Sequence, residues 1–254
     1  MRKVLAILAA ALLLFTGAAA EAPDPTPAPD WPEGWIRYDQ PAGWLETEPF
    51  MWYWVYTPEN LQPGAPLVIY LHSSLGMNRK ALTEPLPRRI IDGEITDVQA
   101  VVLVPQLPGD TDKDWLSALD QVNNIIVKVM EEYQIDPERV SLSGFSLGGI
   151  AVFDFVESAP GRYPRVLSVS GKVRYVHVQV DSFRNTELKV FIGTRDTVVN
   201  TASAVSFVQW MLDAGYSAEL EELDMGHEEV PEDVFARRDI LQWLWLIPEE
   251  EGAE

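Results

Sequence analysis

The stretch Val140-Ser141-Leu142-Ser143-Gly144-Phe145-Ser146-Leu147-Gly148-Gly149 changes its structural preference in the middle. Its first half is a short apolar run of the kind that forms a strand, whereas residues 150–158 have a helix-like pattern. Between the two stands Gly-x-Ser-x-Gly, in which the glycines at 144 and 148 leave room for a close approach of neighbouring backbone. The stretch predicts a strand that turns sharply into a helix and exposes the hydroxyl of Ser146 at the turn.

The surroundings of this short motif decide what it means, because Gly-x-Ser-x-Gly should arise by chance in about one chain in ten of this length. Further apolar runs occur along the chain at 67–71, 101–104, 166–169 and 188–192. Each run is short, does not alternate with polar residues and is bounded by turn-forming residues. These features are typical of strands covered on both faces.

Helical patterns separate these strands. Apolar residues recur at three- and four-residue spacing between Leu116 and Tyr133, and similar patterns run over 202–214 and 234–246. Strands that alternate with crossover helices predict one α/β domain with a mostly parallel sheet and helices on both faces. In such sheets, ligands bind at the carboxyl ends of the strands.

The two ends of the chain have a different composition. Residues 1–20 carry two basic residues, an apolar run too short to span a bilayer and a small-residue end, which is typical of a cleaved signal peptide. Residues 21–34 form a proline-rich linker, 35–248 the globular domain and 249–254 an acidic tail. We therefore expect a secreted protein, extracellular or periplasmic, with no stable membrane anchor.

Composition excludes several classes of partner and chemistry. The chain has 19 basic and 39 acidic residues, a formal net charge of −20, so nucleic acid and anionic membranes are poor partners. It contains no cysteine, which excludes disulfides and a thiol nucleophile.

Aromatic residues are concentrated before the first apolar run. Phe50, Trp52, Trp54 and Tyr56 alternate as on one face of a strand. The pattern fits an aromatic strand buried against the domain better than an exposed platform for stacking sugars.

A serine hydroxyl needs a base to accept its proton, and histidine is the expected base near neutral pH. The chain has three histidines. His72 ends an early strand, before the serine, and His177 lies in an alternating, strand-like segment more typical of a structural histidine. His227 lies in a loop after the last strand-like run and is the predicted base.

The histidine in turn needs a carboxylate that holds its tautomer and stabilises its charge. Asp196 stands just beyond the strand at 188–192, between Ser146 and His227 in the chain. This places serine, acid and histidine in the chain order of one known hydrolase fold, each at a strand end. A turn or helix-cap role is the alternative for Asp196, and Asp224 is the reserve candidate.

Residues 135–149 resemble the elbow region of the α/β-hydrolase superfamily, and more narrowly the branch of dienelactone hydrolases, feruloyl and acetylxylan esterases, polyhydroxybutyrate depolymerases and secreted peptidase-like esterases. The resemblance covers roughly residues 54–245. It implies an α/β-hydrolase fold with a small or absent cap, and a Ser146–Asp196–His227 catalytic triad.

An oxyanion hole needs backbone N–H groups directed at the carbonyl oxygen. Leu147, directly after the serine, is the first predicted donor; the second is Ser74 or, failing that, Ser73, in the loop after His72. The family usually has glycine where this chain has Ser73. Because glycine adopts backbone angles that serine tolerates poorly, we expect an altered oxyanion loop.

One acidic pattern suggests a metal at first sight. Asp110, Asp112 and Asp114 alternate as in the opening of a calcium loop, but Trp115 and Gln121 occupy the places of the turn glycine and the closing glutamate. A solvated loop in which Asp114 caps the next helix is the better interpretation. We predict no metal and no cofactor.

The predicted function is hydrolysis of a carboxylic ester, from a small-molecule or polymer-linked substrate, through an acyl-enzyme on Ser146. The same residues cleave amides, so a secreted serine peptidase is an open alternative. A non-catalytic binding protein on a hydrolase scaffold is a third, suggested by Ser73 and by the aromatic segment.

Overall fold

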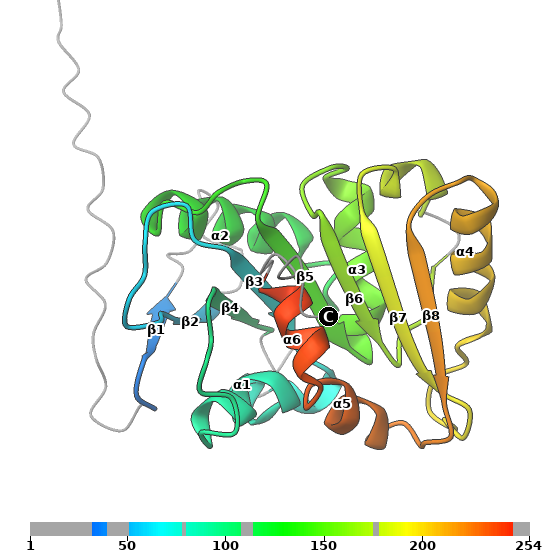
Figure 1. Cartoon of the computed structure of the whole chain (residues 1–254), viewed down its shortest axis with the longest axis horizontal. Coiled ribbons are helices and arrows are strands. Elements are labelled where there is room, and N and C mark those ends of the chain that lie inside the picture. The colour runs from blue at the N-terminus through cyan, green and yellow to red at the C-terminus, as the bar shows by residue number, and fades with distance from the viewer. Residues whose placement is uncertain (1–31, 40–50, 78–79, 108–113, 175–177, 246–254) are drawn as a thin grey trace, which may run out of the picture.

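The computed structural model describes residues 32–39, 51–77, 80–107, 114–174 and 178–245. Within them, one eight-stranded sheet has the strand order β1-β2-β4-β3-β5-β6-β7-β8 (Figure 1). The strands are β1 (Trp35–Asp39), β2 (Trp52–Tyr56), β3 (Leu67–Leu71), β4 (Val101–Gln106), β5 (Val140–Phe145), β6 (Arg165–Val169), β7 (Glu187–Gly193) and β8 (Ala218–Leu223). The helices are α1 (Pro85–Ile91), α2 (Leu119–Glu132), α3 (Leu147–Ser158), α4 (Ala202–Asp213), α5 (Glu229–Val234) and α6 (Arg238–Leu244), with short 3₁₀ helices η1 (Ser74–Gly76), η2 (Ala81–Thr83) and η3 (Val180–Phe183).

The sheet is mostly parallel, as predicted. Strands β4, β3, β5, β6, β7 and β8 run parallel to one another, whereas β2 is antiparallel to both of its neighbours, β1 and β4. The connection from β6 to β7 contains the short helix η3, whose Phe183 packs in the core against Phe153 of α3 and Phe207 of α4. The parallel strands therefore end along one edge of the sheet, and the loops that follow them meet there.

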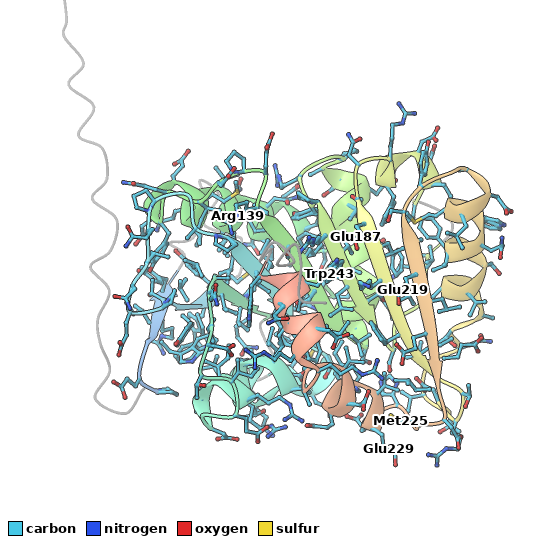
Figure 2. All side chains as sticks on the ribbon, viewed as in Figure 1. Arg139, Glu187, Glu219, Met225, Glu229 and Trp243 are labelled. Atoms are coloured by element: carbon cyan, nitrogen blue, oxygen red, sulfur yellow. The ribbon has the colours of Figure 1, made fainter. Side chains whose placement is uncertain are left out.

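Helices cover both faces of the sheet and divide the core in two. Buried residues of α2, α3 and α4 pack with β-strand residues in one cluster, and those of α1, α5 and α6 form the other. On the second face, the indole N–H of Trp243 donates to Glu187 Oε1 at 2.7 Å, which fixes α6 on β7 (Figure 2). These layers give the predicted α/β architecture.

The described part of the aromatic segment, residues 52–56, forms strand β2 and is buried at its centre, as predicted, whereas Phe50 lies outside the described residues. Tyr53 and Val55 belong to one core cluster and Trp54 to the other, so both faces of the strand are covered. Trp52 and Tyr56 are only partly exposed at its ends. The segment is therefore a structural strand one position in from the edge of the sheet.

The helix predicted over 234–246 begins later than expected. It is α6, at 238–244, whereas Val234 ends the separate helix α5, and Arg237 between them adopts an extended conformation with φ −78° and ψ 122°. The side chain of Arg237 pairs with Asp233 and Glu221, which holds this bend. The break allows the apolar residues of both short helices to pack in the same core cluster.

Several predictions concern residues outside the described ranges. These are the signal peptide, nearly all of the linker, the acidic tail, His177, Asp110 and Asp112. Within the described ranges, no helix has both the length and the apolar character needed to cross a membrane.

Candidate active site

The turn at Ser146 has the sharp geometry that the motif predicts. Strand β5 ends at Phe145 and α3 begins at Leu147, and Ser146 between them has φ 53° and ψ −111°. A Cβ on Gly148 would lie 1.8 Å from the carbonyl oxygen of Leu71, so this position accepts glycine alone. The backbone strain at Ser146 is of the kind found where a side chain is held for chemistry.

Hydrogen bonds on both sides stabilise this turn. The amide of Ser146 donates to the carbonyl of Val169 at 2.9 Å, and the Ser146 carbonyl accepts from Ile150 at 2.8 Å. Ser146 is 8% exposed. Its position is thus fixed by β6 on one side and by the first turn of α3 on the other.

The structure brings Ser146, His227 and Asp196 together. Ser146 Oγ lies 2.9 Å from His227 Nε2, and His227 Nδ1 lies 2.6 Å from Asp196 Oδ2. Ser146 follows β5, Asp196 follows β7 and His227 follows β8, so three strand ends build one hydrogen-bonded chain. With the proton on Nδ1, Nε2 is an acceptor for the serine hydroxyl.

The carboxylate of Asp196 is fully hydrogen-bonded and its side chain is 1% exposed. Oδ2 faces His227, while Oδ1 accepts from the amides of Val198 at 2.8 Å and Val199 at 2.9 Å. Burial alone would raise the pKa of Asp196, but the hydrogen bonds from His227 and the two amides outweigh it and lower the pKa. Asp196 is therefore held in its ionised form.

Asp224, the reserve candidate, does not contact His227. It pairs with Arg195 at 2.9 Å, and Arg195 also reaches Glu229 at 3.2 Å. Glu229 in turn accepts from the amide of Gly226 at 2.6 Å, next to the histidine. Figure 2 labels Glu229 and Met225 at this end of the molecule, where the loops of acid and histidine are joined.

His72 is a buried structural residue. Its Nε2 accepts from the Leu107 amide at 3.0 Å, so its Nδ1 carries the proton and donates to the Ser73 carbonyl at 2.6 Å. Its own carbonyl accepts from the Trp115 indole at 3.0 Å. Burial lowers the pKa of His72 to about 4, so the ring is neutral near pH 7 and ties the loop after β3 to the end of β4.

The predicted oxyanion donors begin two helices. Leu147 is the first residue of α3 and Ser74 the first of η1, positions whose N–H groups have no acceptor within their own helix. The amide of Ser73 instead donates to Glu84 Oε2 at 3.3 Å. Leu147 and Ser74 therefore remain the two predicted donors.

An altered oxyanion loop is expected because serine stands at position 73, but the backbone of Ser73 is not distorted. Ser73 has φ −74° and ψ −178°, an extended conformation open to any residue, so the loop does not require glycine here. Its hydroxyl donates to Glu84 Oε1 at 2.7 Å and accepts from the Leu75 amide at 3.0 Å. Glu84, which is 4% exposed, was not foreseen from the sequence, where a glutamate before Pro85 suggests a solvated helix start.

Asp114 does not cap the next helix, contrary to the prediction: α2 has Ala118 at its N-cap without a side-chain hydrogen bond, and Asp114 instead caps the turn that precedes the helix. Its Oδ1 accepts from the Ser117 amide at 3.1 Å, and its Oδ2 pairs with Arg174 at 2.9 Å. Across the ranges that the structure describes, no group of three or more acidic, histidine or cysteine side chains could hold a metal ion.

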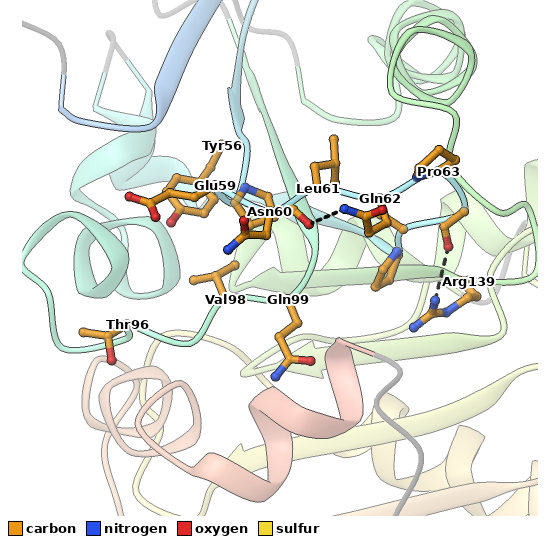
Figure 3. A pocket seen from close by; sticks show the side chains of 14 residues that line it. Tyr56, Glu59, Asn60, Leu61, Gln62, Pro63, Thr96, Val98, Gln99 and Arg139 are labelled. Atoms are coloured by element: carbon orange, nitrogen blue, oxygen red, sulfur yellow. Dashed lines mark hydrogen bonds between the residues drawn. The ribbon is translucent and has the colours of Figure 1, made fainter.

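A separate cavity of about 660 Å³ lies near the amino-terminal ends of the central strands, away from Ser146. Tyr56, Gln62, Gln99 and Arg139 are among the side chains that line it (Figure 3). Arg139 immediately precedes β5, whereas Ser146 immediately follows it, so the cavity and the hydrogen-bonded serine are at opposite ends of this strand.

A strand–serine–helix turn on a mostly parallel sheet, with a histidine and an aspartate at later strand ends, defines the α/β-hydrolase class. Residues 106–244, more than half of the chain, match the family described as Phospholipase/Carboxylesterase. The chain belongs to this family.

Two characterised proteins similar to this chain carry an esterase name. A bifunctional acetylxylan esterase/xylanase of Neocallimastix patriciarum is 28% identical over 175 residues, 61% of this chain and 23% of that protein. An esterase of Escherichia coli (strain K12) is 25% identical over 124 residues, 47% of this chain and 53% of that protein. The chain thus spans about a quarter and about half of the lengths of these two relatives.

Among solved structures, a thermostable esterase has the same fold. It superposes with a TM-score of 0.68 at 19% sequence identity, covering 84% of this chain and 62% of the other.

Proposed function

We propose that this chain is a carboxylic-ester hydrolase in which Ser146 is the nucleophile, His227 the general base and Asp196 the residue that orients the histidine. The observation that carries the proposal is the continuous hydrogen-bonded chain from Ser146 Oγ through His227 to Asp196, with contacts of 2.9 and 2.6 Å. The geometry lies within the reach required of a nucleophile and its base.

In the first half of the reaction, Ser146 Oγ attacks the acyl carbon while its proton moves to His227 Nε2. The carbonyl oxygen becomes an oxyanion, for which the amides of Leu147 and Ser74 are the proposed donors. The carbon–oxygen bond to the alcohol then breaks, and the leaving oxygen takes the proton from His227. The products of this half are the free alcohol and an acyl group on Ser146.

Water completes the cycle along the same route. His227 Nε2 takes a proton from water, the hydroxide attacks the acyl carbon, and Ser146 Oγ leaves with the proton returned by the histidine. Asp196 stays ionised throughout and stabilises the positive charge on His227. The hydrogen bonds from Val198 and Val199 support this role, because they keep the carboxylate charged and fixed.

Esters are the proposed substrates because the family and the relatives are esterases. The acetylxylan esterase relative makes acetyl groups on a polysaccharide one reasonable form of a polymer-linked ester. We also propose that the protein is exported after cleavage of residues 1–20; sequencing the N-terminus of the exported protein tests this.

A substrate panel with matched variants tests the hydrolase proposal. Purified protein is incubated with an aryl acetate, acetylated xylan and a peptide anilide, beside Ser146→Ala, His227→Ala and Asp224→Asn. We expect the parent to hydrolyse at least one ester and little of the anilide. Ester hydrolysis should be lost in Ser146→Ala and His227→Ala and should stay near the parental rate in Asp224→Asn. Faster cleavage of the anilide than of the esters would favour a peptidase. Parental activity in Ser146→Ala would show that Ser146 is not the nucleophile.

A fluorophosphonate probe separates catalysis from a binding role. The probe forms a covalent bond with an activated serine, so we expect labelling at Ser146 that is lost in His227→Ala. An unlabelled, correctly folded parent would support a non-catalytic protein on a hydrolase scaffold.

A further inference from the structure

We propose that Glu84 is a positioning residue for the proposed ester hydrolysis: its buried carboxylate holds the loop of residues 72–76, here called the oxyanion loop, so that the amide of Ser74 faces the reacting carbonyl. The inference rests on the proposed function. Glu84 belongs to the start of α1 and reaches the loop from outside it.

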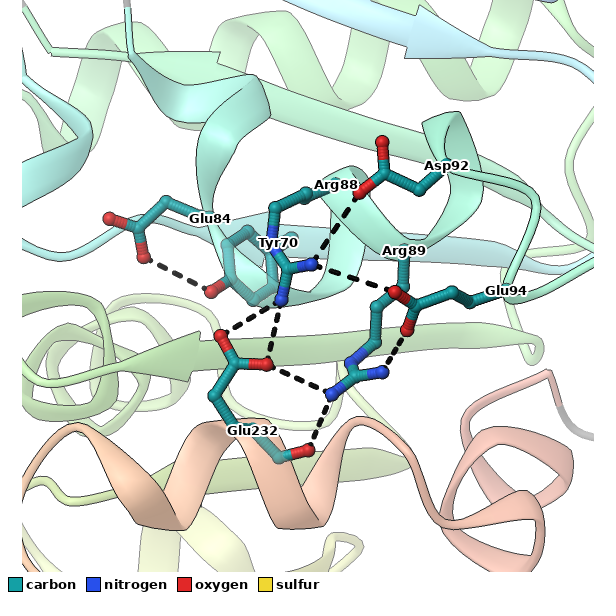
Figure 4. A network of polar contacts seen from close by, with 7 residues as sticks. All are labelled: Tyr70, Glu84, Arg88, Arg89, Asp92, Glu94 and Glu232. Carbon is teal, nitrogen blue, oxygen red and sulfur yellow. Dashed lines mark hydrogen bonds and ion pairs between the residues drawn. The ribbon is translucent and has the colours of Figure 1, made fainter.

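Three donors converge on the Glu84 carboxylate. Oε1 accepts from the Ser73 hydroxyl at 2.7 Å, and Oε2 accepts from the Ser73 amide at 3.3 Å and the Tyr70 hydroxyl at 3.3 Å. The Glu84–Tyr70 contact is drawn in Figure 4. Because all three partners donate, an ionised carboxylate satisfies them, whereas an amide at this position would direct an N–H₂ group at one of them.

The Ser73 hydroxyl links the Glu84 carboxylate to the residues that follow Ser73 in the oxyanion loop. While it donates to Glu84, it accepts from the Leu75 amide at 3.0 Å, so the carboxylate and the start of η1 are linked through one oxygen. The side chain of Ser73 is therefore a bridge between Glu84 and the start of η1.

The orientation of the Ser74 amide follows from peptide geometry. The carbonyl of Ser73 and the N–H of Ser74 belong to one planar, trans peptide and point in opposite directions. The carbonyl accepts from His72 Nδ1 at 2.6 Å and from the Gly76 amide at 3.2 Å. Glu84 holds Ser73 through the N–H of the preceding peptide and through the hydroxyl, and the two contacts on the Ser73 carbonyl hold the following peptide, which carries the Ser74 N–H.

The charged and titratable groups around Glu84 come from three directions. Tyr70 on β3 stays protonated, because burial and the nearby carboxylates of Glu84 and Glu232 raise its pKa. Arg88 on α1 pairs with Glu232 on α5 at 2.7 Å (Figure 4). Burial, with a smaller contribution from Glu228, raises the pKa of Glu84 despite the hydrogen bonds from Ser73 and Tyr70.

The test is a double-mutant cycle on kcat with Glu84→Gln and Ser73→Ala. Removal of one oxyanion donor costs about 10²–10³-fold in kcat; because a misdirected donor costs less, we expect about 10–50-fold for Glu84→Gln, with KM changed less than about 3-fold. Ser73→Ala keeps the carboxylate and should lose about 3–10-fold. Since both act on one peptide unit, the double variant should be only slightly slower than Glu84→Gln.

Glu132→Gln is the matched control. Glu132 accepts from Tyr38 at 3.0 Å in a similar phenol–carboxyl contact, but it lies at the end of α2 and not in the oxyanion loop. It should keep the parental kcat. Circular dichroism and thermal unfolding show whether Glu84→Gln is folded. If it is not folded, Ser73→Ala tests the proposal instead: its kcat should fall while its KM changes little.

The pH profile distinguishes positioning from a general structural role. In the parent, protonation of Glu84 should contribute to the fall of kcat on the acidic side, and in Glu84→Gln that contribution should be absent. Unchanged kcat in Glu84→Gln, or fully additive losses in the double variant, would overturn the proposal.

The rate of fluorophosphonate labelling at Ser146 separates this proposal from the function on which it rests. If the parent is labelled but hydrolyses no ester, the proposed function fails, and slower labelling of Glu84→Gln still supports the positioning role. If the parent is not labelled, both proposals are overturned.

Discussion

His227 Nδ1 lies 2.6 Å from Asp196 Oδ2, and the other oxygen of that carboxylate is occupied by two backbone amides. The aspartate therefore has one free direction, and the histidine fills it. This relationship determines which ring nitrogen carries the proton, and so whether Nε2 can accept a proton from Ser146.

Asp196→Asn tests this dependence. An asparagine keeps the shape, but its oxygen is needed as acceptor for the two backbone amides, so its N–H₂ group faces His227 Nδ1 and favours the wrong tautomer. It also removes the charge that stabilises the imidazolium. We expect kcat to fall about 10³–10⁴-fold with little change in KM. Asp224→Asn, whose carboxylate pairs with Arg195 instead, should keep kcat within about 3-fold of the parent. Equal losses in the two variants would contradict the assignment.

Gly148→Ala tests the close approach at the turn. Its Cβ would meet the Leu71 carbonyl at 1.8 Å, and backbone cannot move aside as a flexible side chain can. We expect a loss of more than about 3 kcal/mol in unfolding free energy, measured by urea denaturation. At Gly215, with φ +79° and open space around it, alanine should cost only about 1 kcal/mol, from the backbone angle alone. A parental stability for Gly148→Ala would show that the turn can open.

The sequence allowed much of this architecture to be predicted, for reasons visible in single elements. The run at 67–71 coincides with β3 because a strand covered on both faces must be apolar at every position. Ser146 could be located because the motif requires glycine at 148, where the Leu71 carbonyl lies so close that a side chain has no room. Asp196 and His227 could be proposed from chain order and strand ends, without knowledge of distances.

Other features depend on packing that no local pattern encodes. The apolar periodicity continues across Arg237, so the break between α5 and α6 is set by partners on β8 and α5. Glu84 stands at a helix start, where carboxylates are usually solvated, and it is buried because Tyr70 and Ser73 supply donors from another segment. The backbone of Ser73 is not distorted, since the loop holds that residue in an extended conformation.

The buried ring of His72 predicts how stability depends on pH. Its pKa is about 4 in the folded protein against 6.5 for an ordinary histidine, so on acidification the unfolded chain takes up a proton that the folded chain refuses. The neutral His72 ring contributes its full share to the free energy of unfolding above pH 6.5. This contribution is lost as the pH falls from 6.5 toward 4, by about 3 kcal/mol in total.

His72→Gln removes that titration while keeping a donor and an acceptor. The difference in unfolding free energy between parent and variant, measured in urea at pH 7, 6 and 5, should shrink as the pH falls. The two proteins share all other titrating groups, so their contributions largely cancel. A difference that stays constant over this range would mean that His72 is not held neutral.

The ion pair between Arg174 and Asp154 gives a last prediction, because it joins the loop after β6 to the helix that follows Ser146. Asp154 lies on α3 with a side chain that is 1% exposed, and Arg174 NH1 contacts it at 3.0 Å. Arg174→Ala removes a cation that contacts this buried carboxylate, so it should destabilise the protein by about 3 kcal/mol. Arg184→Ala, in the same connection between β6 and β7 but paired with Asp181 at the surface, should leave the unfolding midpoint unchanged. Thermal and urea unfolding of the two variants measure the contrast, and equal stabilities would show that Asp154 is satisfied without Arg174.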